Sequence, residues 1–392
     1  MGKLASTYPC LVLRRKRERS LLFRHPWLFS GGIARVEGSP EEGDIVQVVS
    51  HEGKLMAYGF YSERSQITAR LFEFTDSPME FDMGYWYQKL EKAKALRERL
   101  LAGTSTNGYR LVHGEGDGLP GLVVDVYGDM VSVQMRNKGI QRLAPTILSF
   151  LSSSYSHVYS KRSLRAGGST GEWLKGGIDT VQFQENGLRF AVDPVRGQKT
   201  GFFLDQRDNR ALVGRFSNGR KVLNMFSYTG GFSVYALAGG AKEVVSVDSS
   251  KSAMALCDQN IGLNAVDKTL HSSMPVDCFQ YLKQMNQGHF DLIVLDPPAF
   301  SKSPSTVKNA SRGYKDLNLR AMRKIARGGL LFTYSCSQHI SRDLFRKIVF
   351  GAALDAGRHI RIIAQMTQGL DHPIDICHPE GEYLKGLALY VD

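Results

Sequence analysis

The sequence predicts an α/β chain of three parts: a β-rich unit, a middle α+β unit, and a doubly wound unit with a mostly parallel, seven-stranded sheet. Three observations support this fold class. Apolar and polar residues alternate in the N-terminal part, a helical period and hairpin turns follow, and short apolar strands alternate with helices in the C-terminal half. The length of 392 residues suits two or three domains. We therefore expect domains over residues 1–77, 78–185 and 186–392.

The N-terminal unit is predicted to be a small barrel. Residues 43–50 (GDIVQVVS), 54–61 (KLMAYGFY) and 66–74 (QITARLFEF) alternate apolar and polar side chains, with Gly or Ser between them. This alternation is typical of half-buried strands, and three short strands at this spacing favour a compact barrel.

The middle unit mixes helices and hairpins. Residues 86–101 have apolar side chains at helical spacing, and residues 110–135 read as a pair of hairpins with Gly-rich turns. A further helix is expected near 139–152. We expect the Gly-rich stretch 166–177 to end this unit.

The C-terminal unit alternates strands and helices. Its strands are short, β-branched and nearly all apolar, which favours a parallel sheet covered on both faces. The final segment, 383–391, has no crossover helix before it, so we expect it to pair antiparallel at the edge of the sheet. The expected strands are 221–226, 243–248, 269–274, 290–296, 328–335 and 360–366, and the expected helices are 231–239, 250–264, 276–286, 314–326 and 341–356.

Composition and charge exclude several classes of protein. No apolar run is long enough for a transmembrane helix, so no membrane partner is expected. The five cysteines are scattered without a Cys-x-x-Cys pair, which argues against disulfides and metal and favours the reducing cytoplasm. The net charge of +12 is concentrated in residues 1–24 and 301–361. Two basic stretches of this kind favour a polyanion such as RNA.

A glycine turn follows the first strand of the C-terminal unit. The segment FSYTGGFS (226–233) has two adjacent glycines but not the spacing of a dinucleotide site. Asp248 ends the second strand, where an acid can accept hydrogen bonds from a ribose, and Asp277 follows the third strand, where it can meet an adenine amino group. Ribose and adenine without a phosphate cradle describe S-adenosylmethionine better than NAD. The alternative is that both acids only cap helices.

The fourth strand ends in Asp296-Pro297-Pro298. Two prolines stiffen this loop, so that it presents a fixed edge to a flat base. Enzymes that methylate exocyclic amines commonly place an aromatic residue directly after the prolines, whereas this chain has Ala299 there and Phe300 one position later. The fit to amine methylation is therefore incomplete.

Cys336 ends the fifth strand, next to the fourth in such sheets. C5 of a pyrimidine is a poor nucleophile, but attack of a thiolate at C6 makes C5 enamine-like and able to accept a methyl group. That chemistry needs a cysteine and an acid near the base, and Cys336 and Asp296 end the right strands. The alternative is a buried, inert cysteine. His339 is an available base for the thiol, although a surface histidine explains it equally.

Several segments resemble the RlmI-type rRNA methyltransferases. They span most of the chain, and residues 13–33 resemble the PUA RNA-binding domain of that family. The catalytic-part segments are ENGLRFAVDPVRGQKTGFFLDQRDNR (185–210), NMFSYTGGFSVYAL (224–237), DPPAFSKS (296–303), RGYKDLN (312–318), SCSQH (335–339) and DHPIDICHPEGEYLKGL (371–387).

The resemblance implies a PUA β-barrel, a middle domain and a class I methyltransferase domain of Rossmann-like fold. It implies S-adenosylmethionine as donor, a cytosine C5 of large-subunit (23S) rRNA as acceptor, and Cys336 as nucleophile. In the related Nop2/Sun group a second cysteine follows the Pro-Pro pair and assists product release. Ala299 stands there in this chain, so no residue is assigned to product release or to removal of the C5 proton.

The working hypothesis is a cytosine-C5 methyltransferase acting on rRNA. Its alternatives are guanine N7 or N2 methylation without a covalent step, and a non-catalytic RNA-binding ribosome-assembly factor. A homodimer stays open. We expect the cofactor to be held by Asn224, Phe226, Gly230, Asp248 and Asp277, catalysis by Cys336 and Asp296, and substrate binding by Pro297, Pro298, Phe300, Arg14, Arg15, Arg17, Arg24, Arg312 and Lys315.

Overall fold

The computed structural model describes residues 8–163, 169–301 and 303–392. Part of the basic N-terminal stretch and part of the Gly-rich stretch therefore lie outside the described residues. The chain divides into two compact units. The first comprises 1–181, 193–201 and 370–381, and the second comprises 182–192, 202–369 and 382–392. The three domain boundaries expected from the sequence stay a prediction. No helix in the described ranges has the length and apolar character needed to cross a membrane.

The first unit begins with a six-stranded sheet in the order β2-β6-β5-β4-β1-β3. Strands β4, β5 and β6 match the predicted ones, whereas β1, β2 and β3 were missed because none of them shows a long alternation of apolar and polar residues. The apolar side of this sheet forms a core around Leu11, Val46 and Leu71. The elements are β1 (Cys10–Leu13), α1 (Arg19–Leu22), β2 (Trp27–Phe29), β3 (Ile33–Glu37), β4 (Ile45–Val49), β5 (Leu55–Tyr61) and β6 (Ile67–Glu73).

A five-stranded sheet in the order β11-β10-β9-β8-β7 completes this unit. The predicted helix at 139–152 is two helices: Asn137 caps the first, and Pro145 stands in the first turn of the second. Within the Gly-rich stretch, residues 169–175 form β11, antiparallel to β10, and the end of the middle unit there stays a prediction. The elements are α2 (Met83–Leu100), β7 (Gly108–His113), β8 (Leu122–Tyr127), β9 (Met130–Met135), α3 (Lys138–Arg142), α4 (Ala144–Ser152), β10 (His157–Ser163) and β11 (Ser169–Lys175).

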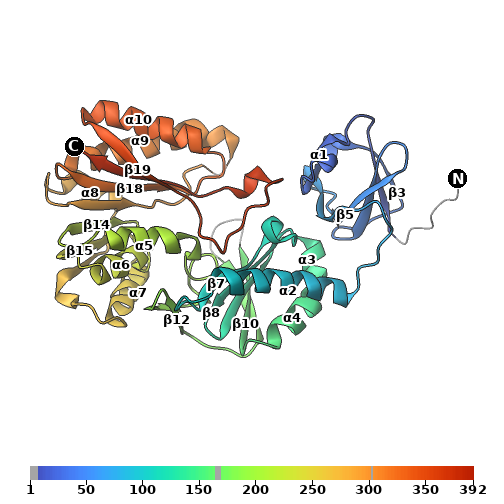
Figure 1. Ribbon diagram of the computed structural model, residues 1–392, viewed down its shortest axis with the longest axis horizontal. Coiled ribbons are helices and arrows are strands. Elements are labelled where there is room, and N and C mark those ends of the chain that lie inside the picture. Colours follow the sequence, from blue (N-terminus) through green and yellow to red (C-terminus); the bar gives the residue numbers. More distant parts are fainter. Residues whose placement is uncertain (1–7, 164–168, 302) are drawn as a thin grey trace. The chain divides into compact units, whose positions relative to one another are not determined.

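The second unit is the predicted doubly wound domain. Its sheet has the order β16-β15-β14-β17-β18-β20-β19 and is parallel except at β20. Helices α8, α9 and α10 pack on one face and α5, α6 and α7 on the other (Figure 1). The strands are β14 (Lys221–Met225), β15 (Glu243–Val247), β16 (His271–Met274), β17 (Leu292–Leu295), β18 (Gly329–Ser335), β19 (Ile360–Met366) and β20 (Lys385–Val391).

Three helices of this unit begin at polar caps. Ser250, Asp277 and Ser341 accept hydrogen bonds from the first turns of α7, α8 and α10. Helix α9 begins at Val307, well before the expected 314, because a short 3-10 turn at Pro304 leads into it. The helices are α5 (Arg207–Arg215), α6 (Gly231–Ala238), α7 (Lys251–Gly262), α8 (Cys278–Gln284), α9 (Val307–Lys324) and α10 (Arg342–Ala356), and a hairpin of β12 (Val181–Glu185) and β13 (Leu188–Val192) precedes them.

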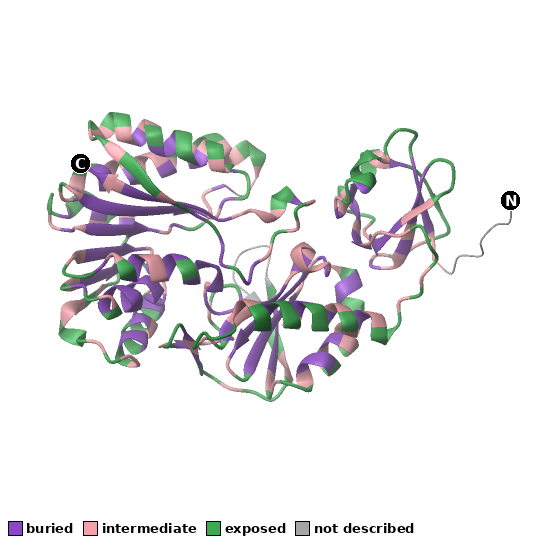
Figure 2. Ribbon diagram, viewed as in Figure 1, coloured by how far each residue is buried: buried purple, intermediate pink, exposed green. Residues whose placement is uncertain are grey.

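The last strand differs from its prediction. β20 lies between β18 and β19, antiparallel to both, instead of at the edge of the sheet. Its residues are almost all buried, whereas β19 is largely exposed (Figure 2). An interior position satisfies hydrogen bonds on both sides of this apolar strand, and the more polar β19 is left at the edge.

Candidate active site at the carboxyl edge of the seven-stranded sheet

The strand order reverses between β14 and β17, and ligands of open α/β sheets bind at such a switch point. The loops after β14, β15, β17 and β18 all leave the same edge of the sheet, because these four strands are parallel. They carry Phe226, Asp248, Asp296 and Cys336. The topology therefore gathers the main predicted cofactor and catalytic residues at one edge.

The turn after β14 has an unusual backbone. Phe226 and Tyr228 have φ values of 57° and 47°, and Gly230 has φ 78°. Such left-handed conformations are strained for residues with a side chain. Neighbouring loops hold the turn in place: the Phe226 N–H donates to Cys278 Sγ at 3.2 Å, and the Tyr228 N–H donates to Asp248 Oδ2 at 3.0 Å.

Asp248 is half-buried at the end of β15 and supports two backbone segments. Its Oδ2 accepts from Tyr228, and its Oδ1 accepts from the Ser250 N–H at 2.9 Å. A carboxylate oxygen has two lone pairs, so both oxygens keep acceptor capacity for ribose hydroxyls. Asp277 is exposed and caps α8 through the Gln280 N–H, which is the alternative role that the sequence left open. A contact of Asp277 with adenine stays a prediction.

Asn224 lies beneath the turn and is almost completely buried. Its Nδ2 donates to Ser233 Oγ at 2.9 Å, while its Oδ1 has no hydrogen-bond partner among the described residues. A buried amide oxygen left in this way is costly unless a ligand or water reaches it. Helix α6 begins at Gly231, and its N-cap residue, Gly230, has no side chain to cap it, so the first N–H groups of the helix are available to a carboxylate. Both features fit an amino-acid-bearing cofactor such as S-adenosylmethionine.

A chain of polar side chains continues from Asn224 to the surface. Ser233 Oγ lies 2.6 Å from Ser246 Oγ, and Ser246 Oγ lies 2.8 Å from His271 Nε2. The imidazole Nδ1 lies 3.5 Å from Asp258, which is exposed. These contacts tie the cofactor turn to α7 and β16.

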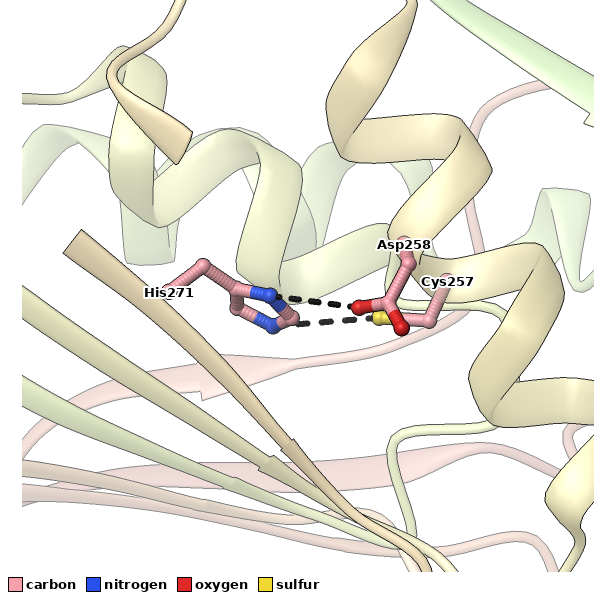
Figure 3. A group of neighbouring side chains, drawn as sticks. All are labelled: Cys257, Asp258 and His271. Carbon is pink, nitrogen blue, oxygen red and sulfur yellow. Dashed lines mark hydrogen bonds and ion pairs between the residues drawn. The ribbon is translucent and has the colours of Figure 1, made fainter. Parts of the chain in front are cut away.

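Figure 3 shows the end of this chain, where Cys257, Asp258 and His271 come close enough to hold an ion. The two imidazole nitrogens are directed to different partners, Nε2 to Ser246 and Cys257 and Nδ1 to Asp258. Burial raises the pKa of Cys257 to about 12 and lowers the pKa of His271 to about 4. The thiol and the imidazole are therefore both neutral at pH 7, and the group supports the turn through hydrogen bonds.

Cys336 directly follows β18 and is half-buried. Its Sγ lies 3.9 Å from the carbonyl oxygen of Pro297, so the thiol lies next to the loop that follows β17. Asp296 directly follows β17. Burial raises the pKa of Tyr334 on the neighbouring β18, and the charge of Asp296 raises it further. The structure thus brings the Asp-Pro-Pro loop and the cysteine together, as the sequence predicted.

A row of aromatic rings runs along this edge. The centroids of Phe226 and Phe279 are 6.0 Å apart, those of Phe279 and Phe300 are 6.2 Å apart, and those of Phe300 and Tyr314 are 4.5 Å apart. The row connects the cofactor turn with the loop after the two prolines. Tyr314 Oη lies 2.9 Å from Ser337 Oγ, which fixes the segment that follows Cys336. Tyr314 is buried, but Phe226, Phe279 and Phe300 are half-buried and offer a stacking surface to a flat base.

One charged residue at this edge was missed from the sequence. Lys385 begins β20 and is 2% exposed. The charge of Cys336 acts on its ammonium group and raises the pKa of this lysine, against the larger effect of burial. The sequence signal that could have identified this buried lysine is its position directly before the apolar run GLALYV. His339, by contrast, is exposed, and the described structure records no contact between it and Cys336.

The predicted phosphate-binding residues fall in both units. Arg14, Arg15, Arg17 and Arg24 are all exposed around α1 in the first unit. The large apolar side chains Leu22 and Phe23 are exposed beside them. Cations mixed with apolar side chains in this way suit a nucleic-acid surface.

Arg312 and Lys315 lie on α9 in the second unit, over a shallow depression of about 400 Å³. Lys308 and Lys347 line the same depression. Lys315 and Lys347 pair with Asp355 and Asp343 at 2.8 and 2.7 Å, whereas the described structure records no ion pair for Lys308 or Arg312. These two cations are therefore the ones available to a phosphate group.

We expect Gly230→Ala to abolish cofactor binding. The Cβ of the alanine would lie 2.3 Å from Cys257 Sγ, at a φ of 78° that alanine rarely adopts. The clash and the strain each cost on the order of 1–3 kcal/mol, and both displace the start of α6. Calorimetric titration with S-adenosylmethionine measures the loss. Gly219→Ala is the matched control, because Gly219 also has positive φ but its Cβ would meet nothing within 4 Å; equal loss in both variants would contradict the steric argument.

Comparison with known proteins supports these assignments of fold and cofactor. The profile of the S-adenosylmethionine-dependent methyltransferases matches residues 127–352, and that of the PUA-like domain matches residues 11–74. The chain is 42% identical over 390 residues to ribosomal RNA large subunit methyltransferase I of Aeromonas salmonicida, covering 97% of this chain and 98% of that protein. It is 40% identical over 392 residues to the protein of the same name from Escherichia coli O139:H28, covering 97% and 99%.

Solved structures share the fold over nearly the full length. A SAM-dependent methyltransferase from Streptococcus mutans superposes with a TM-score of 0.83 at 23% identity, covering 97% of this chain and all of that one. The methyltransferase SMU.776, crystallised with SAH, superposes with a TM-score of 0.84 at 22% identity over the same shares.

Proposed function

Because the chain belongs to the S-adenosylmethionine-dependent methyltransferases, and within them to the ribosomal RNA large subunit methyltransferase I family, we propose that it methylates C5 of a cytosine in large-subunit rRNA. The observation that carries the choice of atom is the placement of Cys336 beside Pro297 of the Asp-Pro-Pro loop. Because the proposed substrate is ribosomal RNA, we propose that the reaction takes place in the cytoplasm.

The proposed chemistry begins at the sulfur of Cys336. The thiolate adds to C6 of the cytosine, and the electron pair of the C5–C6 double bond takes the methyl group at C5. The proton at C5 then leaves to solvent, the double bond forms again, and the C6–S bond breaks to return the thiolate. S-adenosylmethionine would supply the methyl group from its sulfonium sulfur, with S-adenosylhomocysteine as the leaving group.

The remaining residues of the site bind and orient. Asn224, Phe226, Gly230, Asp248 and Asp277 are proposed to hold the cofactor. Asp296, directly after β17, is proposed to position and polarise the cytosine, and Pro297, Pro298 and Phe300 are proposed to bind the base. Because both C5 and C6 must be reached, the target nucleotide has to leave a helix or come from a single-stranded loop.

The identity of the labelled nucleoside tests this function. Purified protein is incubated with unmodified large-subunit rRNA and isotopically labelled S-adenosylmethionine, and the digested RNA is analysed by mass spectrometry. We expect labelled 5-methylcytidine. Labelled N7- or N2-methylguanosine would replace the covalent mechanism with direct transfer to guanine, and cofactor binding without any label on RNA would favour a ribosome-assembly role.

Binding of rRNA should depend on salt through the α9 cations. We expect Lys308→Ala and Arg312→Ala each to reduce the slope of log K against log salt by about 0.7–0.9, the value for one lost phosphate contact. Filter binding of an rRNA fragment at several salt concentrations measures it. Lys251→Ala is the control, because Lys251 is an exposed lysine at the start of α7, outside the depression. A slope unchanged in the α9 variants would remove these residues from the RNA interface.

A further inference from the structure

Lys385 occupies an unusual place for a lysine. It lies opposite Ser335 in the antiparallel pairing of β18 and β20, one residue before Cys336. Its side chain is 2% exposed, at the first position of a strand that is otherwise apolar. Buried lysines are rare unless a partner offsets the loss of hydration.

The surroundings of this ammonium group supply little compensation. Its Nζ donates to the Ser337 carbonyl oxygen at 2.8 Å, and this is the one hydrogen bond that the described structure records for a group with three donors. No described carboxylate lies within 4.0 Å of it. Three charged residues act on its pKa: Cys336 and Glu382 raise it and so stabilise the ammonium form, with Cys336 the stronger of the two, whereas Arg342 lowers it.

Ionisable side chains of three neighbouring elements lie around the segment that holds Cys336. Tyr314 of α9 and Lys385 of β20 each interact electrostatically with Cys336, and Asp296 directly follows the neighbouring β17. Burial raises the pKa of Tyr314, so this phenol is neutral at pH 7. Lys385 is a cation held at the residues on either side of Cys336, because it pairs with Ser335 in the sheet and its Nζ donates to the Ser337 carbonyl oxygen.

We propose that Lys385 is the counter-ion of Cys336 and holds its sulfur as a thiolate. The thiol proton leaves to solvent, the ammonium keeps its own proton, and the pair that results has no net charge. This inference rests on the proposed function for its purpose, because a thiolate is what attack at C6 needs. Burial lowers the pKa of Lys385 to about 8, so the amine is charged at pH 7 and below.

The same pairing gives a reason for product release without a second cysteine. When the sulfur bonds to C6 it loses its negative charge, and the buried ammonium is left without its counter-ion. That state is electrostatically unfavourable in a site with low exposure. Breaking of the C6–S bond restores the ion pair, so Lys385 favours the thiolate as leaving group where Ala299 cannot assist.

The test measures the pH dependence of Cys336 alkylation and needs no RNA. Iodoacetamide labelling of wild-type protein and of Lys385→Met is followed by mass spectrometry of the Cys336 peptide, with the half-exposed Cys377 read in the same digest. We expect the wild-type midpoint to lie at least one pH unit below that of the urea-unfolded chain. Lys385→Met should raise the midpoint by one unit or more, which is about a tenfold slower reaction at pH 7.

Folding and charge are separated by two further measurements. Lys385→Met removes a buried charge, so its thermal midpoint should equal or exceed that of the wild type, whereas a purely structural lysine would lower it. Lys385→Arg keeps a cation and should retain a low alkylation midpoint. The proposal is overturned if wild-type Cys336 titrates like the unfolded thiol, or if folded Lys385→Met titrates like the wild type. Labelled methylguanosine would overturn the proposed function and leave these titrations as they are.

Discussion

Cys336→Ala should lose C5 methylation by about 10³-fold or more while cofactor binding stays intact. The nucleophile and its covalent adduct are removed, and no nearby group can replace a thiolate in this reaction. The side chain contributes little to packing, because it is half-buried and its contact with the Pro297 oxygen is a long one of 3.9 Å. Loss of the sulfur also leaves the buried ammonium of Lys385 without its proposed counter-ion, so stability should fall by about 1–3 kcal/mol. Labelled 5-methylcytidine, calorimetric cofactor binding and urea unfolding measure the three quantities.

Cys377→Ala is the matched control for this experiment. Cys377 is also half-buried, and it belongs to the first unit of the chain. Its replacement should leave methylation unchanged. If Cys336→Ala still methylates rRNA at a rate near that of the wild type, the covalent mechanism is wrong and direct transfer to an exocyclic or ring nitrogen becomes the better explanation.

The residues that end parallel strands could be predicted because the rule that locates them is local. Asp248, Asp296 and Cys336 each follow a short apolar strand, and parallel strands present their carboxyl ends at one edge. Pattern alone therefore indicated the site. The pattern could not decide whether an acid after a strand caps a helix or contacts the cofactor. Asp277 is the example, because its capping hydrogen bond from Gln280 involves only residues close in sequence.

Lys385 could not be found in the same way, because its position depends on long-range pairing. Its ammonium bonds to Ser337, 48 residues earlier in the chain, only because β20 inserts next to β18. The burial of β20 on both faces was visible in its apolar sequence and favours an interior strand. The missing crossover helix suggested an edge instead, yet an antiparallel strand needs no crossover to enter the interior of a sheet.

Glu185→Ala should destabilise the second unit by about 3–5 kcal/mol. Glu185 ends β12 and makes a bidentate pair with Arg210 of α5, with contacts of 2.8 Å to Nε and 2.6 Å to Nη2. Both side chains are almost completely buried. Removing the acid leaves the guanidinium buried without a counter-charge, which is among the costliest single changes in a protein. Urea unfolding monitored by circular dichroism measures the loss.

The same substitution should weaken cofactor binding, because Arg210 supports the turn. Its guanidinium lies over the ring of Phe202 at 4.6 Å and donates to the Phe203 oxygen at 2.8 Å. A Cβ on Gly231 would lie 2.9 Å from Arg210 Cδ, so the arginine packs directly against the first residue of α6. Movement of this side chain displaces the free N–H groups there.

A double substitution separates the lost charge from the lost packing. Glu185→Leu with Arg210→Met fills the space with apolar groups and leaves no unpaired charge, so much of the stability should return. Cofactor affinity should return only in part, because methionine has no group that donates to Phe203. If the double variant is as unstable as Glu185→Ala, packing around the pair and not the unpaired charge sets the cost. In that case Arg210 supports the cofactor turn by its shape alone.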